Sequence, residues 1–379
     1  MIESLVDRSK YPILESMTYL NQASIGLIGQ PAVDAMHAFL DDSARHGNVH
    51  MIDVDEVQFF ESLRSEAATL FNCSTECVAI TAGASEILGQ LPFLMGEGSA
   101  REVVMVASDF PALTRPWVLA VQQGRGTIHW VSDVGNIDLT EALIDSITER
   151  TSVVAVSQVQ FSTGTLLDIP RLRAASARVG AALIVDVTQS AGTYAADSAL
   201  WQADVIVCSG YKWLGGHGGV AISYVTEHLY SETPALAGWM GSPNPFQFDA
   251  KTSEFSQSAR RFTLSTMSYV SLVGLTISLQ ELGRLSPEEK TTHAGGLANY
   301  LVESLGGSDW RTFRSLTDPG ASTHIVPLVH PGHSADPVVT HLREAGICCS
   351  SRNGRVRISI APYTNSVDLD QLVEVLTSS

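Results

Sequence analysis

The chain has 379 residues, enough for two to three units of about 150 residues each. Hydrophobic residues make up 45% and charged residues 17% of the sequence, which supports a large buried core and excludes wholesale disorder. The 23 basic and 40 acidic residues give a formal net charge of −17. This charge argues against a nucleic acid or an anionic membrane as partner, because both attract positive charge.

No apolar run reaches the about 18 residues that a membrane span requires, and the first residues lack the pattern of a signal peptide. The sequence therefore predicts a soluble protein of the cytoplasm. The five cysteines are too sparse for a disulfide framework. No second Cys or His pair accompanies Cys73 and Cys77, so we expect no zinc or other metal site.

The predicted elements begin after about residue 20 with two helices, 31–43 and 54–71, whose apolar residues recur three and four apart. The pattern then changes to short runs rich in Val and Ile, with helical stretches at 139–148 and 170–179 between some of them. These runs predict strands at 78–81, 102–107, 126–131, 152–157, 181–187, 204–208 and 219–225. Buried strands that alternate with helices are typical of a mostly parallel sheet covered on both faces.

A turn-rich break at 242–245 separates this pattern from a smaller α+β unit. The unit begins with two long predicted helices, 267–282 and 287–305. Strands are then predicted at 324–328, 347–350 and 355–360, and helices at 336–344 and 367–376. We expect an N-terminal segment (1–20), a large domain (21–255) and a small C-terminal domain (256–379).

Lys212 is one of only four lysines, and it follows an apolar strand and a short turn. The carboxyl ends of parallel strands are where α/β proteins bind ligands. A lysine removed from water there can form a Schiff base, because burial lowers its pKa. Taken alone, however, the position fits a surface lysine in a loop better.

Two further signals accompany this lysine. Asp186 ends an apolar strand upstream, and a buried carboxylate needs a partner such as the protonated ring nitrogen of pyridoxal phosphate. A helix cap or a metal ligand would also explain Asp186. Ala84 and Ser85 follow a strand at a predicted helix start, which suits a phosphate or an ordinary cap. Each signal is weak alone, but the three in this order predict a pyridoxal-phosphate site.

With these residues the chain resembles the class V aminotransferase group of fold-type I pyridoxal-phosphate enzymes. That group includes cysteine desulfurases, kynureninases and isopenicillin N epimerase-like proteins. The resemblance covers nearly the whole chain and rests on residues 19–24, 47–50, 209–212 and 356–359. It implies an α/β fold with a mostly parallel seven-stranded sheet and a small C-terminal domain. It also implies a homodimer with the site at the subunit interface.

The resemblance gives each matching residue a role. Lys212 would form the Schiff base and move protons at the substrate α-carbon, Asp186 would pair with the pyridine nitrogen, and Gln189 would bond the ring hydroxyl. The other implied cofactor contacts are Ala84, Ser85, Phe110, Ser209, Tyr211, Trp239 and, from the other subunit, Thr266. The implied substrate contacts are Arg357, which would clamp the carboxylate, and Asn21, His50, Phe161 and Arg352. His50 can also be a loop residue, Phe161 a core residue and Arg352 a surface residue.

Several residues differ from those of the relatives and reduce the number of reactions that the sequence allows. Phe110 stands where desulfurases stack a histidine on the cofactor ring, and a phenyl ring carries no proton. Residues 347–354 leave almost no mobile loop for a nucleophilic cysteine, and Cys348 and Cys349 fit small buried strand residues. Ser162 and Ser242 replace an arginine and a histidine of kynureninases. These differences argue against a persulfide-forming desulfurase and a true kynureninase.

We therefore predict an enzyme that acts at the α-carbon of an amino acid, by β-elimination or as a related carbon–sulfur lyase on a cysteine-type S-conjugate. Such sequences also resemble tailoring enzymes of antibiotic pathways, including lincosamide ones. Transamination, epimerisation and decarboxylating oxidative deamination remain alternatives. A non-catalytic relative is more remote because Lys212, Asp186 and Arg357 are retained, and a nicotinamide-dependent oxidoreductase is more remote because its glycine fingerprint is absent.

Overall fold

The computed structural model describes residues 1–95, 102–135 and 138–378. A seven-stranded sheet forms the centre of the large unit, in the order β2-β8-β7-β6-β5-β3-β4. Every pair of neighbours is parallel except the two that involve β8. The strands are β2 (Val78–Thr81), β3 (Glu102–Val106), β4 (Thr127–Val131), β5 (Thr151–Ser157), β6 (Ala182–Asp186), β7 (Val205–Ser209) and β8 (Ala221–Val225). The predicted fold class is thus confirmed.

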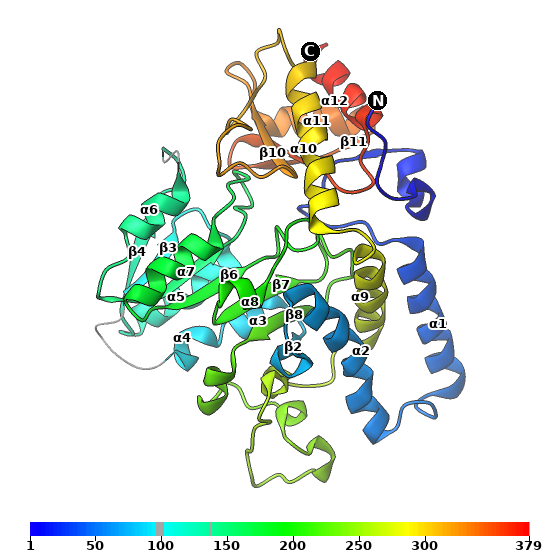
Figure 1. Ribbon diagram of the computed structural model, residues 1–379. Coiled ribbons are helices and arrows are strands. Elements are labelled where there is room, and N and C mark those ends of the chain that lie inside the picture. The colour runs from blue at the N-terminus through cyan, green and yellow to red at the C-terminus, as the bar shows by residue number, and fades with distance from the viewer. Residues whose placement is uncertain (96–101, 136–137, 379) are drawn as a thin grey trace.

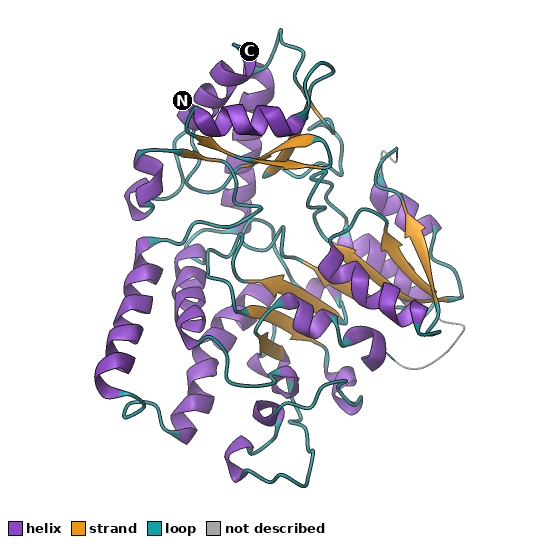
Figure 2. Ribbon diagram, turned by 180° about the vertical axis from the view of Figure 1, so that it is seen from behind, coloured by secondary structure: helices purple, strands orange, loops and turns teal. Residues whose placement is uncertain are grey.

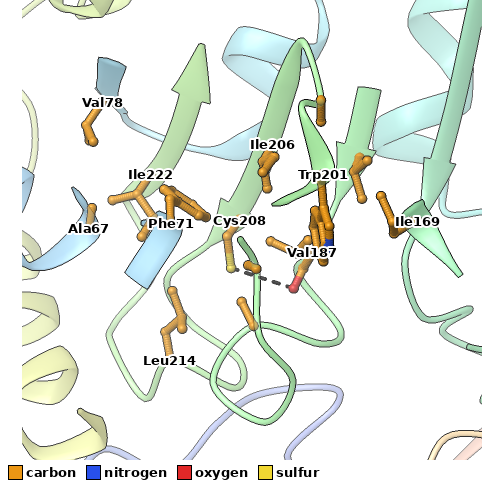
Figure 3. Packing of buried hydrophobic residues seen from close by; sticks show 14 of the residues in the cluster. Ala67, Phe71, Val78, Ile169, Val187, Trp201, Ile206, Cys208, Leu214 and Ile222 are labelled. Carbon is orange, nitrogen blue, oxygen red and sulfur yellow. Dashed lines mark hydrogen bonds between the residues drawn. The ribbon is translucent and has the colours of Figure 1, made fainter. Parts of the chain in front are cut away.

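Hydrophobic clusters on the two faces of this sheet form the core. Successive residues of a strand point to opposite faces, and Ile206 and Cys208 belong to one cluster while Val205 and Val207 belong to the other. Figure 3 shows the first face, where Ile206 and Cys208 lie near Leu214 and Trp201. Because both faces of the central strands are buried, these strands read as continuous apolar runs, which explains why the sequence located them, whereas the edge strand β4 is mostly exposed.

Helices cover both faces of the large sheet (Figures 1 and 2). The helix α2 ends where Asn72 adopts a left-handed conformation (φ 50°), which asparagine tolerates well. The helices up to β7 are α1 (Gln30–His46), α2 (Asp53–Phe71), α3 (Ala84–Leu88), α4 (Leu91–Leu94), α5 (Pro111–Gln122), α6 (Leu139–Asp145), α7 (Ile169–Arg178) and α8 (Ser198–Trp201). None of the described helices is both long and apolar enough to span a membrane.

The small C-terminal unit contains a four-stranded antiparallel sheet in the order β12-β13-β10-β9. Its strands are β9 (Arg311–Thr312), β10 (Ile325–Val329), β12 (Ser350–Arg352) and β13 (Arg355–Ser359). Its helices are α10 (Pro287–Ser304), α11 (Ala335–Glu344) and α12 (Ser366–Thr377). Ser286 and Glu289 form a capping box that starts α10.

The stretch 347–350 does not form the single strand that the sequence predicts. Ile347–Cys348 form β11, which pairs in parallel with β1 (Thr18–Tyr19), whereas β12 pairs with β13. The chain therefore changes sheets at Cys349. Alternating hydrophobicity cannot show this change, because it reports burial and not the identity of the partner strand.

The packing of the N-terminal segment and of α9 can be compared with the predicted domain boundaries. The N-terminal segment lies on the small unit, through β1 and through an ion pair of 2.7 Å between Arg8 and Asp368, and both termini lie there in Figure 1. The helix α9 (Tyr269–Leu282) follows the predicted boundary at 255/256, yet its buried leucines belong to the core of the large sheet. The packing thus favours a boundary between α9 and α10, and the division at 255/256 stays a prediction.

Candidate active site

A cavity of about 150 Å³ lies at the carboxyl ends of the central strands, where the fold predicts a ligand site. Lys212 follows β7 and Asp186 ends β6. The residues of the sequence prediction that line it are Ala84, Ser85, Phe110, Phe161, Asp186, Gln189, Ser209, Tyr211 and Lys212. Nine predicted residues, which are spread over 129 positions of the sequence, therefore meet in one cavity.

Lys212 is buried, and its Nζ atom lies 4.9 Å from the centre of the Phe110 ring. Burial lowers the pKa of Lys212 to about 8, while the negative charge of Asp186 opposes this shift and the positive charge of Arg357 adds to it. The unprotonated amine, the form that attacks an aldehyde, is then far more abundant near neutral pH than in an ordinary lysine. The backbone of Gly26 packs directly against the backbone of Lys212. A Cβ at residue 26 would lie only 2.0 Å from the Lys212 carbonyl oxygen.

Asp186 is buried and accepts a hydrogen bond of 2.8 Å from the backbone N–H of Thr188. The Thr188 hydroxyl in turn accepts a bond of 3.0 Å from the backbone N–H of Ser209. Burial raises the pKa of Asp186, and the hydrogen bonds from Thr188 and the charge of Lys212 oppose that shift. No ion pair to Asp186 forms among the described residues, so the carboxylate is suited to a cationic ligand atom.

Phe110 contributes an aromatic face to the cavity and is 36% exposed, so it is not a core residue. Its ring meets the Phe161 ring edge-on at 5.3 Å. The buried carboxylate of Asp109 holds the neighbouring backbone, because it accepts from the Phe110 N–H (2.7 Å), the Ser157 N–H (2.8 Å) and the Ser157 hydroxyl (2.6 Å). Asp109 is a supporting residue that the sequence prediction missed.

Gln189 lines the cavity, but its side chain already has two partners. Its Nε2 donates to the Ala23 carbonyl (3.0 Å), and its Oε1 accepts from the Trp213 indole (2.9 Å). A bond to a ring hydroxyl would therefore use the second proton of the amide. That role of Gln189 stays a prediction.

Two arginines of the small unit converge on one hydroxyl. Arg357, on β13, is buried and donates through Nη1 to the Phe161 carbonyl (2.8 Å) and through Nη2 to Ser24 Oγ (2.6 Å). Arg352, on β12, donates through Nη2 to the same Ser24 oxygen (3.1 Å). Burial, and next the positive charge of Arg352, lower the pKa of Arg357 to about 9. The Nδ2 atom of Asn21 donates to the sulfur of Cys348 at 3.8 Å. The Oδ1 atom of Asn21 is buried and has no hydrogen-bond partner.

Six predicted residues do not line the cavity: Asn21, Arg352 and Arg357, described above, and three that lie farther away. His50 is exposed after α1 and hydrogen-bonds Asp42 at 3.0 Å. Trp239 packs on Phe246 and lines a separate cavity formed by residues 237–255. Thr266 donates to Glu56 at 3.4 Å. The family resemblance implies that Thr266 acts across a subunit interface. The functional roles of His50, Trp239 and Thr266 stay predictions.

The structure adds Thr188, Ser157 and Ser24 to the site. Thr188 follows the predicted Asp186 strand directly, and Ser24 belongs to the motif at 19–24, so both stood beside recognised signals. No local pattern marks Ser157, which ends β5 as a buried strand residue.

The family model described as Aminotransferase class-V matches residues 18–372. The chain belongs to this family. Among class V relatives, the uncharacterized aminotransferase YcbU of Bacillus subtilis is 25% identical, over 98% of this chain and 96% of that protein. The cysteine desulfurase CsdA of Escherichia coli is also 25% identical, over 97% and 96%. A kynureninase of Deinococcus radiodurans is 31% identical, over 62% of this chain and 53% of that protein.

Solved structures of other proteins have the same fold. A C-DES mutant with glycine covalently linked to the PLP cofactor superposes with a TM-score of 0.90 at 20% identity, over 98% of this chain and 99% of that chain. The CsdA structure from Escherichia coli gives 0.86 at 22% identity, over 98% and 96%. The resemblance to this family and the enzyme prediction are thus confirmed, and the expected cofactor is pyridoxal phosphate.

The side chains of the cavity fit this cofactor. Asp186 is a buried carboxylate without a cationic partner among the described residues, and Lys212 is a buried amine of lowered pKa. A Cβ at Gly83, beside Ala84, would meet no atom within 4 Å, so there is open space next to the helix start that was predicted to hold the phosphate. The chain is a pyridoxal-phosphate-dependent class V enzyme whose individual residue roles are proposals.

Proposed function

We propose that this class V enzyme eliminates a thiol from the β-carbon of a cysteine-type S-conjugate. The observation that carries the proposal is the state of the two cysteines beside Arg357. Burial raises the pKa of Cys348, and it raises the pKa of Cys349 to about 12, so both remain thiols near neutral pH. The two residues lie in or between β11 and β12, which leaves no mobile loop. A persulfide-forming desulfurase needs a reactive thiolate.

The reaction needs a group that moves the α-proton. Pyridoxal phosphate, when bound, delocalises the electron pair left at the α-carbon. In this proposal the Lys212 amine would carry the cofactor and then accept this proton, since the facing ring of Phe110 cannot. Burial, with the charge of Asp186, raises the pKa of Tyr211, so its hydroxyl stays protonated. Arg357 would hold the substrate carboxylate through its planar fork.

The overall reaction breaks the α-carbon–hydrogen bond and the β-carbon–sulfur bond and forms a double bond between the two carbons. The thiolate leaves with the electron pair and takes up a proton. Water then converts the released enamine to pyruvate and ammonia. One S-conjugate and one water therefore yield one thiol, one pyruvate and one ammonia, with no external oxidant or reductant.

The test measures these three products from the holoenzyme with S-alkyl and S-aryl cysteines. We expect thiol, pyruvate and ammonia in equal amounts. Alanine with protein-bound persulfide would instead show a desulfurase. A keto acid that retains the thioether, with the cofactor left in its amine form, would show a transaminase, and racemised substrate alone would show an epimerase.

We also infer that the enzyme is a homodimer, as the family resemblance implies. Leu236, Trp239 and Phe248 are 47%, 40% and 70% exposed within one segment. Large apolar side chains gathered in this way are typical of an interface, and a second subunit would cover them. Light scattering should give twice the chain mass. A place in an antibiotic pathway stays a prediction from the resemblance.

A further inference from the structure

Arg352 and Arg357 form a pair of guanidinium groups without an acidic partner. Both donate to the Ser24 hydroxyl, and their other hydrogen bonds go to the backbone carbonyls of Ser351 and Phe161. Among the described residues, no carboxylate forms an ion pair with either arginine. The Arg357 Nε atom is buried and has no hydrogen-bond partner at all.

Two like charges held this close repel each other, and a buried one costs additional free energy. Each guanidinium has five N–H donors, and the bonds above engage only part of them. The remaining donors and the uncompensated charge are suited to anionic ligand atoms. Arg352 is only half-buried, so a ligand can reach it from solvent.

The two guanidinium groups lie side by side. Arg352 of β12 faces Arg355 of β13, and Arg357 faces Ser350, so Arg352 and Arg357 are diagonal neighbours on one face of the sheet. Their Nη2 atoms lie 3.1 Å and 2.6 Å from the same Ser24 oxygen. One α-carboxylate would pair only one of the two positive charges, whereas two anionic groups of one small molecule would pair both.

We propose that the substrate is dianionic, with Arg357 binding the α-carboxylate and Arg352 a second anionic group on the departing thiol. This inference rests on the proposed function and deepens it. The substrate class is then a cysteine S-conjugate whose thiol part carries a carboxylate or a similar anion. Arg352 and Arg357 are two neighbouring positive charges in a chain of net charge −17, and they favour an anionic substrate at this site.

The test compares two conjugates that differ only in charge, S-(2-carboxyethyl)-L-cysteine and its amide, S-(2-carbamoylethyl)-L-cysteine. We expect the native holoenzyme to prefer the acid in kcat/KM by about 10- to 100-fold. In Arg352→Gln this preference should disappear, because kcat/KM should fall far more for the acid than for the amide. Arg352→Lys should restore part of the preference, since it restores the charge.

Arg311→Gln is the matched control, because Arg311 is an exposed arginine of the same unit that bonds only backbone carbonyls of Ser308 and Trp310. It should leave the preference unchanged. Calorimetry adds a readout without turnover: succinate should bind the native enzyme more tightly than succinamate, and this difference should vanish in Arg352→Gln.

Two results would overturn the inference. Equal losses for the acid and the amide in Arg352→Gln would show that both arginines hold the α-carboxylate. A native enzyme that does not distinguish the acid from the amide would leave no site for a second anion. If neither conjugate is eliminated while succinate still binds through Arg352, the two-anion site stands and the elimination assignment fails.

Discussion

The amine of Lys212 and the ring of Phe110 face each other across 4.9 Å in the cavity. Asp186 lies in the same cavity, and these three residues would hold a cofactor attached to the amine. An apolar aromatic face can stack on the cofactor but leaves proton transfer to the lysine. We therefore expect Phe110 to contribute to the affinity for the cofactor and Lys212 to transfer the proton.

Phe110→Leu should weaken cofactor binding because it removes the stacking face while retaining an apolar side chain. We expect the Kd for pyridoxal phosphate to rise about 3- to 10-fold. Titration of the apoenzyme by absorbance measures this, with Phe39→Leu, which packs on Phe59 outside the cavity, as the control. An unchanged Kd in Phe110→Leu would remove the ring from the cofactor site.

The pH dependence of cofactor attachment should report the environment of Lys212. The unprotonated amine reacts, so the attachment rate to the apoenzyme should rise with pH through about 8 and then level. Asp186 raises the pKa of Lys212 by its charge, so Asp186→Asn should move the midpoint to lower pH. Stopped-flow absorbance checks both midpoints. A midpoint near the ordinary lysine value, or an upward move in Asp186→Asn, would contradict the electrostatics described above.

Arg357→Lys should raise KM for the amino-acid substrate about 10- to 100-fold and leave cofactor binding intact. The change keeps a positive charge but loses the planar fork that binds a carboxylate through two N–H groups. Steady-state kinetics and the cofactor Kd separate the two effects. If KM stays as in the native enzyme, Arg357 does not hold the carboxylate.

Asp109→Ala should destabilise the large unit by about 2–4 kcal/mol, because it leaves the Ser157 and Phe110 N–H donors without their buried acceptor. The loss of support at Phe110 should also weaken cofactor binding. Urea denaturation of the apoenzyme gives the free energy of unfolding. A change below about 0.5 kcal/mol would show that Asp109 carries little of the fold.

Cys348→Ala and Cys349→Ala should each retain elimination activity within about threefold, because neither thiol takes part in the proposed reaction. The thermal midpoint of each variant serves as the folding control, since Cys349 is buried. A loss of more than about 100-fold in a variant that remains folded would point to a thiolate nucleophile and a desulfurase reaction.

Much of the fold could be predicted from the sequence because its strands are buried on both faces. The ranges 78–81 and 152–157 agree with β2 and β5 to within one residue. The division of 347–350 between two sheets could not be predicted, since the partner strand β1 lies more than 300 residues away. Pairing over such a distance depends on tertiary packing and leaves no local pattern.

The candidate site was predictable where strand ends carry unusual residues, as with Asp186 and Lys212. The hydroxyl of Ser24 that joins Arg352 and Arg357 was not, because its contacts with β12 and β13 span more than 300 residues of sequence and form only on folding. His50, Trp239 and Thr266 lie outside the cavity of one chain, so a single sequence offers no test of a role across an interface.

The central claim is that Lys212 carries the cofactor, and borohydride reduction of the holoenzyme followed by peptide mass mapping tests it most directly. Lys290 is an internal control, because burial also lowers its pKa to about 8 but it lies on α10 and donates to the Leu282 carbonyl. The account predicts a pyridoxyl adduct on Lys212 and none on Lys290. An adduct spread over both lysines, or no adduct with added pyridoxal phosphate, would contradict it.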